Sequence, residues 1–119
     1  MKEQLAAVHQ AVLDYAEGWY LGDLDRMARA LHPGFIKRRA AEDDDGFETF
    51  GRDDVLNFVA EGIGVDDDCE ITIIVDDISE IVASARCYSC LYLDLVHLGK
   101  FDDEWKLVHA YYRHLDSNE

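Results

Sequence analysis

The chain has 119 residues, of which 49% are hydrophobic and 31% are charged, and its formal net charge is -15. This length and composition predict one domain, residues 1–119, with its own apolar core. The charge argues against a nucleic acid or an anionic membrane surface as a partner, because both require a basic face. The first residues are too polar for an export signal, so the sequence predicts a cytoplasmic protein.

Two helices are predicted at the start of the chain. Apolar residues recur three and four positions apart over residues 3–20, which is typical of a helix with one buried face. They are Leu5, Val8, Val12, Tyr15 and Trp19. Gly22 ends this helix, and Asp23 is placed to cap a shorter second one. Pro33 ends the second helix, because the residue before a proline is disfavoured in helical geometry.

A short strand is predicted over residues 35–39, followed by a solvated acidic loop over residues 42–46. A third helix follows over residues 51–64, with Asp53 and Asp54 in its first turn, where the helix dipole favours them, and Gly64 at its end. After this helix, apolar residues recur at about every second position instead of every third or fourth, which is typical of strands. Strands are expected over residues 69–76, 81–98 with a turn near Ser89, and 104–114. This order predicts an α+β domain with an antiparallel sheet and the helices on one face.

The last two strands form a tight hairpin if Asp102 and Asp103 are its loop residues. Asp94 then lies opposite Tyr111 and beside His109. The same face carries Tyr92, Val96, Leu98, Leu107 and Arg113. Burial disfavours a carboxylate, so we expect His109 or Arg113 to hold Asp94 if it is ionised.

The opposite face of this hairpin is also largely apolar in the same register. It carries Leu93, Leu95, His97, Val108, Ala110 and Tyr112. The helices can cover only one face of the sheet. The second apolar face therefore predicts a homodimer formed through the sheets.

The segments YAEGWYLGDLDRMARALHPGFIKR and YLDLVHLGKFDDEWKLVHAYY, with the order of helices and strands between them, resemble the nuclear-transport-factor-2-like superfamily. The similarity spans nearly the whole chain and is greatest to the putative lumazine-binding branch. It implies a cystatin-like cone, with three N-terminal helices packed on a strongly curved mixed or antiparallel sheet. It also implies a pocket inside the cone and dimerisation through the other face of the sheet.

The superfamily includes ketosteroid isomerases, and the resemblance places two residues of this chain at their oxyanion hole. Tyr15 falls at the tyrosine and Asp94 at the neutral aspartic acid beside it. The aspartate base of those enzymes falls at about Arg39, and a guanidinium cannot abstract a proton. The sequence therefore argues against steroid isomerisation by that mechanism.

Three consecutive cations, Lys37, Arg38 and Arg39, stand out in this acidic chain. On a strand, Lys37 and Arg39 point one way and Arg38 the other. If Arg39 faces the cone, Lys37 and Arg39 suit an anionic or carbonyl-bearing ligand, and Arg38 meets solvent or a partner subunit. The alternative is a solvated edge strand paired with the acidic loop. His32 either caps the preceding helix or binds the ligand.

The cysteines and the aspartate runs predict no metal site and no cofactor. Cys87 and Cys90 lie in a strand-like run without a second pair, so we expect buried or turn thiols along with Cys69. The runs 43–45 and 66–68 lack the spacing of a calcium loop and are expected to be solvated.

Two functions are compatible with these residues. The first is a small-molecule-binding protein, or an enzyme of unknown activity, for an aromatic or carbonyl-containing ligand, with anionic ligands included. The residues expected around that ligand are Tyr15, Trp19, His32, Lys37, Arg39, Tyr92, Asp94, His109 and Tyr111. In catalysis Asp94 or His109 would move a proton and Tyr15 would polarise an oxygen. The alternative is a non-catalytic assembly or protein-interaction domain with a filled cone. A ligand pocket should be a connected cavity of about 300 Å³ or more with convergent polar groups, and a filled cone would rule out the first function.

Overall fold

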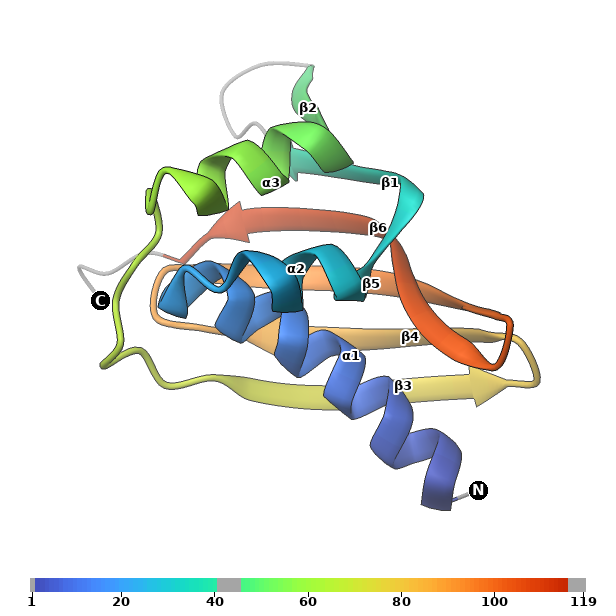
Figure 1. The fold of residues 1–119 in the computed structure, drawn as a ribbon. Coiled ribbons are helices and arrows are strands. Elements are labelled where there is room, and N and C mark those ends of the chain that lie inside the picture. The colour runs from blue at the N-terminus through green and yellow to red at the C-terminus, as the bar shows by residue number, and fades with distance from the viewer. Residues whose placement is uncertain (1, 41–45, 116–119) are drawn as a thin grey trace.

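The computed structural model describes residues 2–40 and 46–115, and these residues form three helices and one six-stranded sheet (Figure 1). In chain order the elements are α1 (Lys2–Leu21), α2 (Leu24–Ala30), β1 (Leu31–Ala40), β2 (Phe47–Gly51), α3 (Arg52–Ala60), β3 (Thr72–Ser79), β4 (Val82–Tyr88), β5 (Tyr92–Phe101) and β6 (Glu104–His114).

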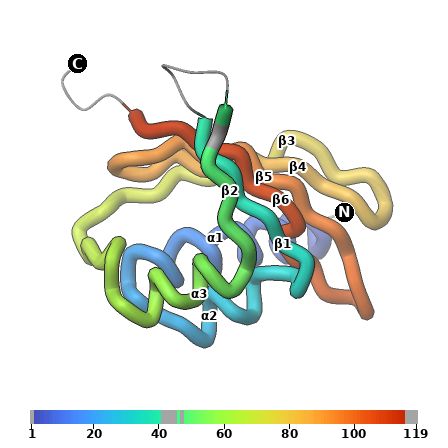
Figure 2. The backbone as a smooth tube through the Cα atoms, turned by 90° about the horizontal axis from the view of Figure 1, so that it is seen from above, coloured from blue at the N-terminus to red at the C-terminus, as the bar shows by residue number. Residues whose placement is uncertain are grey.

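The strands lie in the order β2-β1-β6-β5-β4-β3. β1 and β6 run parallel and the other neighbours are antiparallel, so the sheet is mixed. β2 and β3 are its two edges, and the sheet is not closed. Figure 2 shows the three helices gathered on one side of the sheet, which confirms the predicted α+β arrangement. We call the side covered by the helices the inner face and the other side the outer face.

The helix ends follow the predicted signals at most positions. Gly22 has a φ of 66°, a conformation that glycine adopts without strain, and it separates α1 from α2. The side chain of Asp23 accepts a hydrogen bond from the Arg26 backbone N–H at 3.2 Å, so Asp23 caps α2 as expected. Asp54 accepts a hydrogen bond from the Gly51 backbone N–H at the start of α3. α3 ends at Ala60, before the predicted limit.

The strand that carries the three cations is longer than predicted and is not an edge. β1 begins at Leu31, and its pairing with β6 shifts register between Leu31 and Ile36, the segment that contains Pro33. A proline is tolerated in a strand at such an irregularity. β2 pairs outside β1. The expected edge strand is therefore wrong, and the acidic loop lies mostly outside the described residues.

The last hairpin has the predicted turn but not the predicted register throughout. Phe101 pairs with Glu104 and Leu98 with Leu107, as expected. Beyond Leu98 a β-bulge shifts the pairing by one residue, because Val108 is an extra residue in β6. Asp94 therefore lies opposite Tyr112 and not Tyr111.

The bulge reverses which side chains of β6 face the helices. Before it Trp105 and Leu107 are buried, and after it Ala110 is buried while Tyr111 is 41% exposed. Ala110 and Tyr112 thus join the inner face, and His109 and Tyr111 move to the outer face. The core lies between the helices and the inner face. Its largest fully buried side chains are Phe35, Met27, Leu31, Leu98, Leu107, Val8, Val12, Val55 and Val96.

Candidate functional site

Three polar side chains from α1, β1 and β5 meet within the apolar core. The Tyr15 hydroxyl donates a hydrogen bond to Asp94 Oδ2 at 2.6 Å. Lys37 Nζ donates to the Tyr15 hydroxyl, also at 2.6 Å, and lies 3.8 Å from Asp94 Oδ2. Tyr15 and Asp94 are 4% and 5% exposed, and the Lys37 side chain is 12% exposed. We call these residues the Lys37 cluster.

Burial sets the electrostatics of the Lys37 cluster. It raises the pKa of Tyr15 well above its ordinary value, and the Asp94 carboxylate raises it further. It lowers the pKa of Lys37, although Asp94 acts in the opposite direction. Cys87 pairs with Asp94 across β4 and β5, and burial, with the Asp94 charge second, raises the pKa of this thiol to about 12.

Aromatic rings surround the ammonium group of Lys37. Its Nζ lies 5.0 Å from the ring centre of Tyr15, 5.2 Å from that of Trp19 and 4.6 Å from that of Tyr112. All three distances are within the range of cation–π attraction. The Lys37 amine is therefore held by one hydrogen bond to Tyr15, one longer ionic contact to Asp94 and cation–π contacts with three aromatic rings.

Lys37 also lines a hollow of about 160 Å³ between the helices and the inner face. Five aromatic residues line the same hollow: Trp19, Phe50, Phe58, Tyr92 and Tyr112. Phe58 makes edge contacts with Trp19 and Phe50, and Tyr92 makes one with Tyr112. We call this space the aromatic hollow.

A much smaller space of about 20 Å³ lies next to the Lys37 cluster. It is lined by all three cluster residues and by Trp19, Tyr92 and Cys87, among others. Because Trp19, Lys37 and Tyr92 line both spaces, the cluster borders the aromatic hollow on one side. Of the three cluster residues, Lys37 is the one that lines the aromatic hollow as well as the smaller space.

The structure brings most of the predicted ligand residues together. Tyr15, Trp19, Lys37, Tyr92 and Asp94 all lie at the two spaces just described. Lys37 and Arg39 share the inner face, as the alternation predicts. Arg39 forms an ion pair with Glu48 of β2. Its charge partly offsets the raised pKa values of Tyr92 and Tyr112, which burial causes in both cases.

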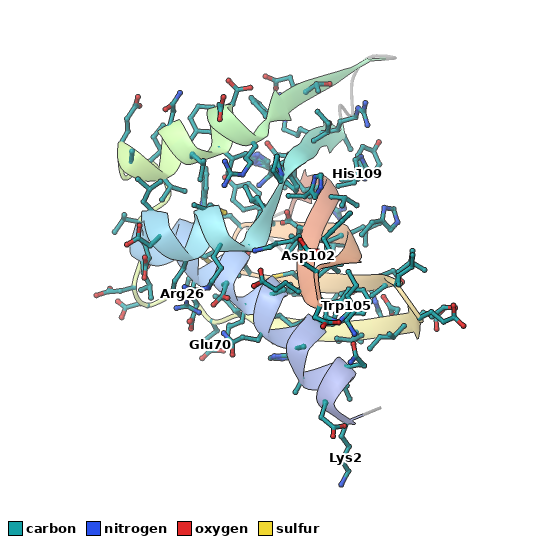
Figure 3. All side chains as sticks on the ribbon, turned by 45° about the vertical axis from the view of Figure 1, so that its right-hand side comes forward. Lys2, Arg26, Glu70, Asp102, Trp105 and His109 are labelled. Carbon is teal, nitrogen blue, oxygen red and sulfur yellow. The ribbon has the colours of Figure 1, made fainter. Side chains whose placement is uncertain are left out.

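Three predicted site residues lie elsewhere. His109 is labelled on β6 in Figure 3. It belongs to the outer face, where its ring stacks on His97 with ring centres 5.6 Å apart and lies 3.2 Å from the Arg38 guanidinium. Tyr111 pairs with Leu95 on that face. Both predictions depended on a regular hairpin register, which the bulge at Val108 breaks.

His32 is the third residue outside the site. Its Nδ1 accepts a hydrogen bond from the Gly34 backbone N–H, and its ring lies 4.3 Å from that of Phe101. Phe101 is beside the β5–β6 turn, whereas Asp94 lies near the other end of β5. His32 therefore neither caps α2 nor reaches the Lys37 cluster.

Sequence reasoning missed three of the aromatic residues that line the hollow. Tyr112 was assigned to the outer face by the regular register, and no residue in the sequence marks the bulge. Phe50 follows the acidic loop, and no pattern in the sequence indicated that β2 would pair with β1. Phe58 was covered by the prediction of a helix over residues 51–64, and it also lines the hollow.

The thiols and the described aspartate run lie away from the Lys37 cluster, apart from Cys87. Cys87 is buried, and Cys90 lies in the turn between β4 and β5, where its backbone N–H donates to Cys69 Sγ. The carboxylates of residues 66–68 are exposed, with ligand atoms within 4.8 Å of one another. The run 43–45 lies outside the described residues. Across residues 2–40 and 46–115, no helix has the length and apolar character needed to cross a membrane.

The protein is an α+β domain in which three helices cover one face of a mixed sheet. A buried polar cluster lies beside an aromatic hollow between these two layers. The family model described as putative lumazine-binding matches residues 3–113, so the chain belongs to that family. No curated protein matched the chain by sequence.

Solved structures share the fold at low sequence identity. An NTF2-like protein of unknown function from Shewanella baltica has a TM-score of 0.84 at 17% identity, covering 97% of this chain and 96% of that one. A ketosteroid isomerase-like protein from Erwinia carotovora atroseptica has a TM-score of 0.73 at 15% identity, covering 98% and 99%. A cystatin-like fold protein from Burkholderia xenovorans has a TM-score of 0.67 at 17% identity, covering 92% and 90%. At these identities the similarity establishes the fold alone.

Proposed function

We propose that this protein binds a small organic molecule in the aromatic hollow, with an anionic or carbonyl group of the ligand directed at Lys37. The observation that carries the proposal is the position of the Lys37 amine, which is buried and borders a space lined by five aromatic rings. Binding sites of this kind combine an apolar lining with a few convergent polar groups.

The size of the aromatic hollow limits the ligand. Its volume of about 160 Å³ is below the range of about 300–1,000 Å³ that is usual for drug-sized ligands. A dry apolar cavity of about 150 Å³ in another protein holds one benzene molecule. The proposed ligand is therefore a molecule of about one aromatic ring, and a steroid is too large.

The hydrogen bonds of the Lys37 cluster indicate which residue contacts the ligand oxygen. The Tyr15 hydroxyl already donates to Asp94 and accepts from Lys37. An ammonium group has three donors, and Lys37 uses one on Tyr15. Lys37 is thus the donor that remains for a ligand, whereas Tyr15 and Asp94 hold it in place. This differs from an oxyanion hole in which the tyrosine and the aspartic acid both donate to the substrate.

Thermal stabilisation tests the proposal. We expect benzoate, benzaldehyde and phenol to raise the melting temperature of the protein, and steroids to leave it unchanged. A ligand at ten times its Kd raises the free energy of unfolding by about 1.4 kcal/mol, which is a shift of a few degrees for a domain of this size.

Two lysine variants make this test specific. Lys37→Met should lose most of the benzoate effect, because the charge that attracts the carboxylate is gone. Lys100→Met, which removes a lysine on the β5–β6 hairpin, should keep the effect. If none of the single-ring compounds stabilises the protein, or if the two variants respond alike, the ligand proposal is wrong.

The small hollow also favours a second function. A domain whose interior is mostly filled by side chains can serve as an assembly or protein-interaction module. In that case no compound of the panel would bind, and the exposed outer face of the sheet would contain the functional surface.

A further inference from the structure

Lys37 differs from the other three lysines of the chain in its surroundings. Lys2 is exposed at the start of α1. Lys100 and Lys106 are partly exposed on the β5–β6 hairpin. Lys106 donates to the Arg29 carbonyl and pairs with Glu104, as a surface lysine does. Only Lys37, among these four, combines burial with a place on the lining of the aromatic hollow.

The contacts of Lys37 also form a path for a proton. Its Nζ donates to the Tyr15 oxygen, and the Tyr15 hydroxyl donates in turn to Asp94 Oδ2, both at 2.6 Å. A proton moving from Lys37 to Tyr15, with the Tyr15 proton moving to Asp94, leaves a neutral amine and a neutral carboxylic acid. Burial lowers the pKa of Lys37, which favours the neutral amine. Buried lysines of this kind serve as amine nucleophiles.

We propose that Lys37 is a nucleophile that forms an imine with a small aromatic aldehyde or ketone bound in the aromatic hollow. This inference rests on the proposed function, since the carbonyl compound must first occupy that hollow. The geometry that carries it is the amine on the lining of the hollow, with a hydroxyl and a carboxylate behind it.

Each bond and proton of the reaction is accounted for by the ligand and the Lys37 cluster. The lone pair of Nζ forms a bond to the carbonyl carbon, and the carbonyl π electrons move to the oxygen. A proton passes from nitrogen to that oxygen, giving a carbinolamine. Asp94, protonated through Tyr15, returns its proton by the same route through the Tyr15 hydroxyl to the carbinolamine hydroxyl group, which leaves as water while the nitrogen lone pair forms the C=N bond. The ammonium and the aldehyde thus become a protonated imine and water, and Asp94 is again a carboxylate.

The surroundings that stabilise the ammonium also stabilise the product. The protonated imine keeps one positive charge at the same nitrogen, facing Asp94 and the rings of Tyr15, Trp19 and Tyr112. No net charge is created or lost in the core, so the reaction does not require the burial of a new charge.

Reductive trapping tests the inference. The full chain is incubated with benzaldehyde, then treated with borohydride, which converts an imine into a stable amine, and the protein is analysed by intact mass and peptide mapping. We expect one added benzyl group, located on Lys37, at a benzaldehyde concentration at which Lys2, Lys100 and Lys106 are modified at least tenfold less. The Tyr15→Phe variant should be labelled at least tenfold more slowly than wild type, because its proton path is broken.

Binding of benzyl alcohol, measured by thermal shift, separates the two proposals. Benzyl alcohol fits the same hollow but has no carbonyl group. If both benzyl alcohol and benzaldehyde stabilise the protein and no benzyl group is trapped on Lys37, the imine inference is wrong and the ligand proposal stands. If neither compound stabilises the protein and nothing is trapped, both are wrong. Equal labelling of all four lysines would also overturn the inference. Peptide mapping of the wild-type protein is enough to detect that outcome, so this part of the test does not depend on whether a variant folds.

Discussion

At the scale of single residues, stability alone does not explain the Lys37 cluster. Lys37 and Asp94 are both nearly removed from water, and burying two charges costs several kcal/mol each before their attraction is counted. Replacing such a pair with apolar residues is often neutral or stabilising. A lysine at this place in an apolar core is therefore better explained by what it binds than by what it stabilises.

The thiol of Cys87 provides a pH test of this burial. An unfolded thiol ionises near its ordinary pKa of 9.0, whereas burial holds the pKa of Cys87 at about 12. Between these values the folded state keeps a proton that the unfolded state has lost, so stability falls as the pH rises. The contribution of this thiol is fully present below pH 9 and is lost toward pH 12. One such group changes the free energy of unfolding by at most about 1.4 kcal/mol per pH unit.

We therefore expect the free energy of unfolding of Cys87→Ala to fall less steeply than that of wild type as the pH is raised from about 8 to about 10.5. Urea unfolding at each pH measures the two slopes. Val96→Ala is the matched control, because it opens a cavity on the same inner face and keeps the thiol. The control should have a lower free energy of unfolding than wild type at every pH, with the same slope against pH as wild type. If Cys87→Ala and wild type have the same slope, the thiol is not held protonated by burial.

At the scale of elements, β6 explains which predictions succeeded. The helix signals at Gly22 and Asp23 act within a few residues of themselves, so the sequence alone predicted α1 and α2 well. The β5–β6 turn and the first pairs next to it were also predictable, because the turn fixes the register around it. A resemblance put Asp94 and Tyr15 in one predicted site, whereas the alternation along β1 put Lys37 and Arg39 on one face without deciding which face that was.

The register beyond Leu98 was not predictable from local sequence. Val108 is an ordinary strand residue, and nothing about it marks the extra position. Because side chains alternate along a strand, one extra residue moves every later side chain to the other face. This single feature placed Tyr112 in the site and His109 and Tyr111 outside it.

Deleting Val108 tests the bulge directly. In the absence of this residue, β6 can pair with β5 in a regular ladder, and Ala110 and Tyr112 keep their inward direction. We expect the deletion variant to fold, with a loss of about 1–3 kcal/mol in the free energy of unfolding, which is typical for a strained but intact core. Urea unfolding and the near-ultraviolet circular dichroism of the buried aromatic residues measure this outcome.

The deletion of Ala110 is the matched control. It removes one residue from the same strand, but it turns Tyr112 outward and Tyr111 into the core. That variant should not fold into a stable domain. If the two deletions are equally harmful, Val108 is not the residue that the ladder can omit.

At the scale of the whole molecule, the outer face of the sheet carries exposed apolar side chains and has no helix over it among the described residues. Large side chains on this face that are more than a third exposed include Ile74, Val82, Leu95 and Tyr111. Leu95 and Tyr111 are paired across β5 and β6 at the centre of the sheet. Next to them lie Arg38, His97 and His109, which makes the surface apolar in the middle and polar around it, as many interfaces are.

We propose that two copies associate through this face, and that Leu95→Glu and Tyr111→Glu convert the dimer into monomer. A buried carboxylate at either place would lie near its copy across the two-fold axis, which adds repulsion to the cost of desolvation. Light scattering after size exclusion measures the mass of each variant. Leu5→Glu is the control, since Leu5 is 50% exposed on α1, on the helical side of the molecule. It should leave the dimer intact.

The charge of the chain gives the proposed dimer a second measurable property. Each copy carries a formal charge of -15, so association brings together two strongly acidic bodies. At low ionic strength their repulsion opposes binding, and about 0.15 M salt reduces the range of that repulsion to about 8 Å. The dissociation constant should therefore fall as salt is raised from about 0.01 M to 0.15 M. If the protein is a monomer at every salt concentration and at high protein concentration, the outer face is not a dimer interface. If Leu5→Glu disrupts a dimer and Leu95→Glu does not, the interface lies on the helices.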